Sequence, residues 1–84
     1  MDAVIKAQYA TASFSNEETI KKSNECACYY CCKHFPPSEI KTWIKESRGR
    51  TAQCPYCDVD SVIGDATGLP VDIASLEIAH KELF

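Results

Sequence analysis

A small α+β domain is the fold class that the sequence predicts, and three observations predict it. Two C-x2-C pairs, Cys28 with Cys31 and Cys54 with Cys57, each adjoin a short stretch suited to a β-strand. Helix signals stand before the first pair and near the end of the chain. The length of 84 residues allows one domain with a marginal core. We therefore expect a single domain over residues 1–84, in which short strands carry the cysteine pairs and helices pack around them.

The segment before the first cysteine pair contains one clear helix signal. Residues 1–13 are weakly patterned and fit either a helix or a strand. Ser15 is followed three residues later by Glu18, the arrangement of a capping box, which predicts a helix over residues 16–22. Two lysines close this stretch, and positive charge there stabilises the carboxyl end of a helix.

The segment between the two pairs fits more than one structure. Ser38 can cap a helix over residues 39–46, in which Ile40, Trp43 and Ile44 share one face. A strand would place Trp43 on the side opposite Ile40 and Ile44, so the helix is the preferred interpretation. The sequence "SRGR" then predicts a turn, and "TAQ" predicts a short strand that enters the second pair.

The segment after the second pair predicts a strand, a loop and a helix. "SVIG" has the composition of a returning strand, and "GDATGLP" has that of a loop. Asp72 can cap a last helix over residues 73–83. One face of this helix would carry Ile73, Leu76, His80 and Leu83. We expect His80 to be a satisfied core residue, to cover the cysteine pairs or to bond a carbonyl of the "SVIG" segment.

The cysteine pairs predict a metal site. No targeting segment and no run of about 20 apolar residues is visible, so we expect a cytoplasmic protein whose thiols stay reduced. Two residues between cysteines let the chain turn tightly, so that each pair forms a knuckle with both sulfurs facing one point. Four such sulfurs suit a tetrahedral Zn²⁺. The predicted cofactor is one structural Zn²⁺ per chain, with disulfides or a rubredoxin-type iron site as alternatives; the predicted ligands are Cys28, Cys31, Cys54 and Cys57.

Two knuckles on short strands are typical of a zinc-ribbon-like domain. A treble clef, in which the second pair opens a helix, is the alternative, although two glycines follow that pair closely and disfavour a long helix. Cys26 and His34 stand near the first pair and are reserve ligands. Cys32 adjoins Cys31, so its side chain must point elsewhere, and we expect it to be packed rather than reactive.

Several stretches of the chain also resemble a known family. They are "CACYYCCKHF", "EIKTWI", "TAQCPYCDVDSVIGDATGLP" and "AHKELF". Together they resemble a family of small uncharacterised bacterial and phage cytoplasmic zinc-knuckle proteins, over about residues 14–84. The resemblance implies a zinc-binding fold and no particular activity. This chain has Ala27 and Asp58 where the family pattern has glycine, a residue that would permit a positive φ.

Charge and composition favour binding over catalysis. The net charge of −3 argues against a general nucleic-acid binder. No histidine or acid stands at a recognisable spacing beside a nucleophile, and four protein ligands would leave the zinc no open position for water. The acids of "DVDSVIGD" are assigned to turns. We therefore expect a protein-interaction or regulatory module that is not an enzyme, binds an unidentified protein partner and binds no membrane.

Aromatic residues around the knuckles are the candidates for partner contact, because Tyr and Trp often anchor interfaces. These partner-binding candidates are Tyr29, Tyr30, Trp43 and Tyr56. The alternative function is a nucleic-acid-binding zinc knuckle, in which the tyrosines stack on bases while Lys33, Arg48 and Arg50 contact phosphates. A third and less favoured hypothesis is a treble-clef nuclease that is pared down in size.

Overall fold

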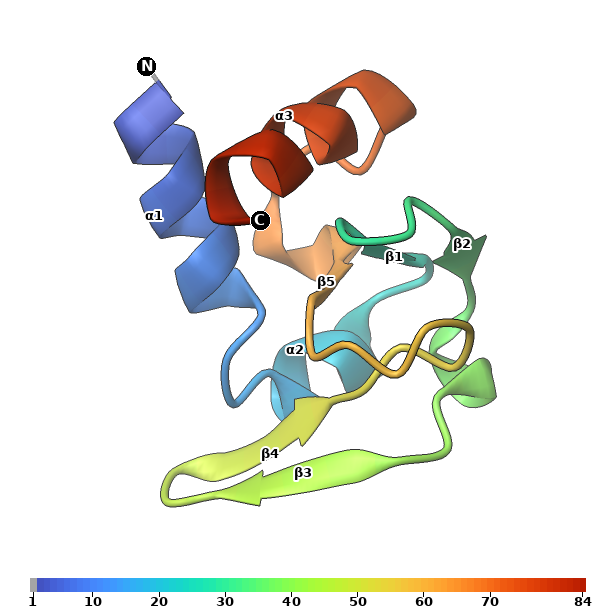
Figure 1. The fold of residues 1–84 in the computed structure, drawn as a ribbon. Helices are drawn as coiled ribbons and strands as arrows, with labels where there is room; N and C mark the ends of the chain where they lie inside the picture. Colours follow the sequence, from blue (N-terminus) through green and yellow to red (C-terminus); the bar gives the residue numbers. More distant parts are fainter. Residues whose placement is uncertain (1) are drawn as a thin grey trace.

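The computed structural model describes residues 2–84, and this part of the chain forms three α-helices and five short strands (Figure 1). The helices are α1 (Asp2–Ala12), α2 (Glu17–Lys22) and α3 (Ile73–Leu83). The strands are β1 (Cys26–Cys28), β2 (His34–Phe35), β3 (Trp43–Glu46), β4 (Gly49–Ala52) and β5 (Val62–Gly64). Two short 3-10 helices span Pro37–Glu39 and Asp65–Thr67. The α+β class is therefore confirmed. None of the helices described here is long and apolar enough to cross a membrane.

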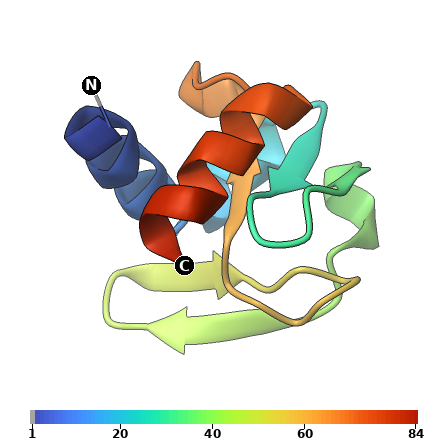
Figure 2. The same cartoon turned by 45° about the horizontal axis from the view of Figure 1, so that its top comes forward.

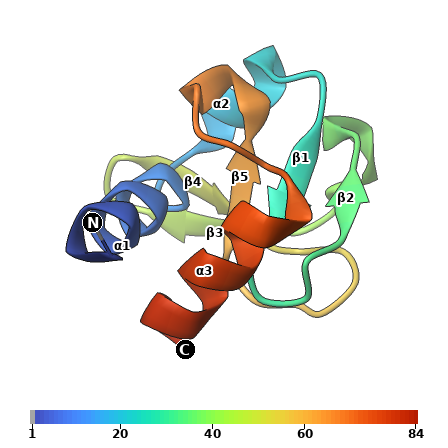
Figure 3. The same cartoon turned by 90° about the horizontal axis from the view of Figure 1, so that it is seen from above.

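The strands form two antiparallel sheets, and the second cysteine pair lies where the chain passes from one sheet to the other. Strands β2, β1 and β5 lie side by side in that order (Figure 3). In this sheet Cys26 is paired with Phe35 on one side and with Gly64 on the other. Strands β3 and β4 form a separate hairpin. The first knuckle begins at Cys28, the last residue of β1, and leads to β2, whereas the second lies between β4 and β5, so both knuckles join strands.

The three-stranded sheet is covered on both faces. In Figures 1 and 2, α3 lies on one side of it and the β3–β4 hairpin on the other. Successive residues of a strand point to opposite faces. Ala27 and Ile63 accordingly pack with Leu76 of α3, whereas Cys28 and Val62 belong to a second cluster. We call the cluster with α1 and α3 the helical cluster; its buried members are Tyr9, Ala27, Tyr29, Ile63, Leu76 and Ala79.

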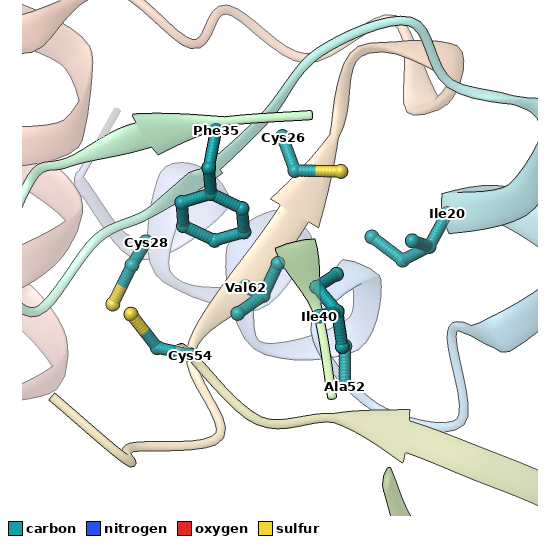
Figure 4. Packing of buried hydrophobic residues seen from close by; sticks show 8 residues of the cluster. All are labelled: Ile20, Cys26, Cys28, Phe35, Ile40, Ala52, Cys54 and Val62. Carbon is teal, nitrogen blue, oxygen red and sulfur yellow. The ribbon is translucent and has the colours of Figure 1, made fainter. Parts of the chain in front are cut away.

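The other cluster, which we call the cysteine cluster, contains the knuckles. Figure 4 shows its buried members, which are Ile20, Cys26, Cys28, Phe35, Ile40, Ala52, Cys54 and Val62. These side chains come from α2, from both sheets and from the loop after Pro37–Glu39. The knuckle sulfurs therefore lie at the edge of an apolar core rather than on a loop in open solvent.

The predicted helix over residues 39–46 is wrong. Residues Trp43–Glu46 form β3, and only Pro37–Glu39 forms a single 3-10 turn. The strand is stabilised by its partner, since Trp43 is paired with Ala52 and Glu46 with Gly49 around the predicted "SRGR" turn. Aromatic and β-branched residues suit such a paired surface. Pairing with β4 therefore overrode the local pattern, which had favoured the helix.

The predicted capping box at Ser15 is also wrong, although the helix that it predicted is present as α2. Asn16 is the N-cap of α2 and makes no capping hydrogen bond. Ser15 instead adopts a left-handed backbone with φ of 48°. The side chain of Asn16 is used across the core: its Nδ2 donates to Val62 O at 2.7 Å, and its Oδ1 accepts from Ala52 N at 3.0 Å. Asn16 thus links β4 to β5, the two strands that flank the second knuckle.

The C-terminal elements follow the prediction closely. Strand β5 lies within "SVIG", and α3 covers Ile73–Leu83. The carboxylate of Asp72 accepts a hydrogen bond from Ser75 N at 3.1 Å, which is the predicted N-cap. The residues after Cys57 form a loop and then β5, so the helix that a treble clef requires does not begin at the second pair.

Candidate metal centre

The four predicted ligands converge on one point. The sulfurs of Cys28, Cys31, Cys54 and Cys57 all lie within 4.8 Å of one another. Two close separations run between the knuckles, 3.6 Å from Cys28 Sγ to Cys57 Sγ and 3.7 Å from Cys31 Sγ to Cys54 Sγ. A tetrahedral ion with bonds of about 2.3 Å would hold its sulfurs about 3.8 Å apart. The four side chains can therefore hold one metal ion with little movement.

The two knuckles have the same backbone. In the first, Cys32 N donates to Cys28 O at 2.8 Å, and in the second, Asp58 N donates to Cys54 O at 3.0 Å. The peptide N–H two residues after the first cysteine points at its sulfur in both, at 3.4 Å from Tyr30 N to Cys28 Sγ and from Tyr56 N to Cys54 Sγ. Such N–H groups stabilise negative charge on sulfur. Both turns therefore place a backbone N–H group where it can stabilise a thiolate.

Each knuckle ends in a left-handed residue. Cys32 has a φ of 62° and Asp58 a φ of 65°. Glycine is the usual residue in this conformation, and aspartate tolerates it better than most. The glycine that the family pattern places at Asp58 would thus suit the backbone observed there. Ala27, the other departure, lies in β1 and does not have a positive φ.

The sulfurs differ in their surroundings. Cys28 is fully buried, and its Sγ lies 3.0 Å from Ser61 Oγ. Burial alone would raise the pKa of Cys28, but hydrogen bonds from Ser61 and from backbone N–H groups lower it. Burial raises the pKa of Cys54 to about 11 and also raises the pKa of Cys57. The second pair therefore keeps its protons at neutral pH unless a cation stabilises the thiolates.

The reserve ligands lie elsewhere. Cys26 is fully buried and its sulfur points toward Ile20, away from the sulfurs of Cys28 and Cys54 (Figure 4). Burial, with nearby acidic side chains, raises the pKa of this thiol to about 12. His34 is exposed, and its Nε2 is hydrogen-bonded to Val71 O. Neither belongs to the group that converges. Cys32 packs against the helical cluster, as expected of a packed thiol.

The predicted contact residues fall into three situations. Tyr30 and Tyr56 are 43% and 51% exposed, one on each knuckle. Trp43 is half-buried, with the guanidinium of Arg50 over its ring at 5.5 Å. Tyr29 is not exposed as expected: it is 5% exposed, and its hydroxyl lies 2.8 Å from Ser13 Oγ. Its ring packs edge-to-face against Tyr9 of α1 in the helical cluster, with centroids 6.1 Å apart, so Tyr29 is a core residue rather than a contact residue.

His80 covers the first knuckle from α3, as one of the expected alternatives had it. Its Nδ1 lies 3.2 Å from Tyr29 O, and its ring lies 5.3 Å from that of Tyr30. Phe84 adds a ring at 4.8 Å from Tyr30.

Two supporting residues, Ser61 and Asn16, were missed by sequence reasoning. Their contacts reach across 33 and 36 or more positions, so no local pattern marks them.

The acids after the second knuckle lie in three different environments. Asp65 accepts a hydrogen bond from Asn24 N at 3.0 Å through Oδ1. Asp58 supplies the left-handed residue, and its carbonyl accepts from Gln53 Nε2 at 2.6 Å. Asp60 is exposed. Only Asp58 thus has a role in a turn, through its backbone, whereas the side chain of Asp65 binds a segment 41 residues earlier in the chain.

Comparison of the chain with family models, with curated proteins and with solved structures gave no match.

Proposed function

We propose that the protein is a zinc-stabilised, zinc-ribbon-like module of the cytoplasm that acts by binding a partner protein. The observation that carries the proposal is the convergence of four cysteine sulfurs within 4.8 Å. Thiolate ligands select zinc or iron over magnesium or calcium. With all four positions filled by protein sulfurs, zinc has no place for a reactive water, which favours a structural role and no enzyme activity.

The metal part of the proposal is tested by elemental analysis. Protein purified from a reducing cytoplasm without added metal should contain one equivalent of zinc per chain. A Cys54→Ser variant should lose it, and Cys32→Ser should retain it, because Cys32 lies outside the converging group. Less than half an equivalent of zinc would contradict the proposal. Colourless protein would also distinguish zinc from a rubredoxin-type iron centre.

The binding part rests on Tyr30 and Tyr56. Both are large, exposed aromatic side chains on preformed knuckles, and such residues anchor protein interfaces. The net charge of −3 works against phosphate contacts. The matched control is Phe14→Ala, because Phe14 is 54% exposed but lies outside both knuckles.

A pull-down from host lysate, with and without nuclease treatment, tests this part. Tyr30→Ala or Tyr56→Ala should weaken capture of a partner by about tenfold or more while zinc content stays at one equivalent. Phe14→Ala should capture the partner as the wild type does. Capture that disappears on nuclease treatment, together with micromolar binding of single-stranded oligonucleotides in physiological salt, would replace the protein partner with nucleic acid.

A further inference from the structure

Ser61 touches the first knuckle from the chain that follows the second. It is 1% exposed and stands directly before β5. Its Oγ lies 3.0 Å from Cys28 Sγ, and its carbonyl oxygen accepts a hydrogen bond from Tyr29 N at 3.0 Å. The pairing of Cys28 with Val62 in the sheet holds the two segments together. Side chain and backbone therefore fix the hydroxyl against the sulfur.

The direction of this hydrogen bond depends on the state of Cys28. A thiol can donate or accept, and so can a hydroxyl. A cysteine that binds metal is a thiolate and has no proton to donate, so Ser61 must then be the donor. Hydrogen bonds to charged acceptors are shorter and roughly twice as strong as neutral ones. Because the pair is buried, water does not compete for the sulfur.

The equivalent cysteine of the second knuckle has no hydroxyl donor among residues 2–84, the part of the chain that the structure describes. Cys54 corresponds to Cys28, and both sulfurs accept a hydrogen bond from the peptide N–H two residues later. Beyond the knuckle, Cys54 Sγ has Cys31 Sγ at 3.7 Å, whereas Cys28 Sγ has the Ser61 hydroxyl as well as Cys57 Sγ. Among the described residues, Cys28 is the one ligand with a hydroxyl at hydrogen-bond distance.

We infer that Ser61 is a positioning residue for the metal: its hydroxyl donates to the Cys28 thiolate, orients that sulfur and reduces the negative charge that it presents to the ion. The inference rests on the metal-binding function proposed above. It makes the two knuckles unequal as ligands although their backbones are alike. Groups that hydrogen-bond to metal ligands typically change metal affinity by about 10–100-fold when they are removed.

The experiment compares Ser61→Ala with Ser61→Thr, which keeps the hydroxyl, and with Ser13→Ala. Ser13 is also a buried serine, 5% exposed, but its hydroxyl bonds Tyr29 Oη and touches no sulfur. Zinc affinity is measured by competition with a chromophoric chelator. We expect Ser61→Ala to bind zinc about 10–100-fold more weakly. Because metal binding and folding are coupled, Ser13→Ala measures how much of this loss comes from reduced stability alone.

The second readout is the absorption spectrum of the protein saturated with Co²⁺. Loss of a hydrogen bond raises the energy of the sulfur electrons, so the sulfur-to-cobalt charge-transfer band of Ser61→Ala should move to longer wavelength. The band should not move in Ser13→Ala, and Ser61→Thr should keep the wild-type position. Reduced stability lowers the fraction of loaded protein but does not shift this band. An unshifted band in Ser61→Ala would overturn the inference and leave the proposed metal function intact.

Two further outcomes are distinguishable. Wild-type protein without the visible bands of tetrahedral cobalt would overturn the metal function, and this inference with it. If Ser61→Ala does not fold at saturating cobalt, the test moves to wild-type protein loaded with ¹¹³Cd. The Ser61 hydroxyl proton should then exchange slowly with solvent and show nuclear spin coupling to cadmium through Cys28 Sγ. A rapidly exchanging, uncoupled proton contradicts the inference.

Discussion

The first knuckle is covered by helix α3, whereas the second follows the end of β4 and packs against β2. His80 and Phe84 pack against Tyr30 of the first knuckle. The corresponding Tyr56 contacts Phe35, with ring centroids 5.8 Å apart, and has the ammonium of Lys33 over its ring at 5.1 Å. The backbones of the two knuckles are nevertheless alike, both in their hydrogen bonds and in the left-handed residue that ends each of them. A knuckle is thus a local structure, and the protein around it decides how firmly it is held and what it presents.

The largest effect is expected from removing the metal ion that the two knuckles bind together. Chelation of the metal, or Cys54→Ser, should abolish cooperative thermal unfolding, because a structural zinc contributes on the order of 10 kcal/mol in a small domain. Far-ultraviolet circular dichroism during heating measures this. Cys32→Ser is the control and should unfold as the wild type does. A metal-free protein that still melts cooperatively would show that the two hydrophobic clusters suffice without the ion.

The second effect concerns the pH dependence of zinc affinity. The raised pKa of Cys54, about 11, and of Cys57, both due first to burial, means that the metal-free site binds more protons than the loaded site. Raising the pH therefore favours metal binding. Zinc affinity should rise by more than about tenfold for each pH unit between pH 6 and pH 8, since each bound zinc displaces more than one proton. Chelator competition at several pH values measures the slope. A slope below tenfold per unit would mean that most of the thiols are already ionised.

The third effect tests the support of the second knuckle. Asn16→Ala should lower the free energy of unfolding by about 2–4 kcal/mol, because it leaves Val62 O and Ala52 N buried without their side-chain partner. Denaturant titration of the zinc-loaded protein measures it. The matched control is Asn24→Ala, an exposed asparagine whose loss should have little effect. Equal small effects in both variants would show that β4 and β5 do not depend on this link.

The fourth effect tests the cover on the first knuckle. His80→Ala removes the hydrogen bond to Tyr29 O and one ring from the Tyr30 stack, which should cost about 1 kcal/mol. Ile73→Ala, on the same helix and 58% exposed, should change stability much less. Zinc release to excess chelator should also become faster in His80→Ala. Release at the wild-type rate would indicate that α3 only lies against the knuckle and does not restrain it.

The smallest effect tests the backbone that both knuckles share. Asp58→Gly should raise the free energy of unfolding by about 0.5–1 kcal/mol, since glycine adopts the observed φ of 65° without strain. Asp60→Gly is the control: Asp60 is exposed and does not have a positive φ, so added flexibility should slightly destabilise it. Cys32→Gly should gain less than Asp58→Gly, because the Cys32 side chain packs against the helical cluster. A destabilising Asp58→Gly would contradict this account.

The sequence by itself determined the features that depend on neighbouring residues. Each C-x2-C pair predicted its own knuckle, because two intervening residues suffice to make the turn. That the two knuckles meet was predicted only from the four ligands that a zinc ion requires. Asp72 predicted the start of α3, because its carboxylate reaches only as far as Ser75. Only the tertiary structure decided features that depend on distant partners. It made Trp43–Glu46 a strand by pairing it with β4, and it directed Asn16 to two strands instead of a helix cap. It also brought Ser61 to Cys28, because the pairing of β1 with β5 joins segments that no local pattern connects.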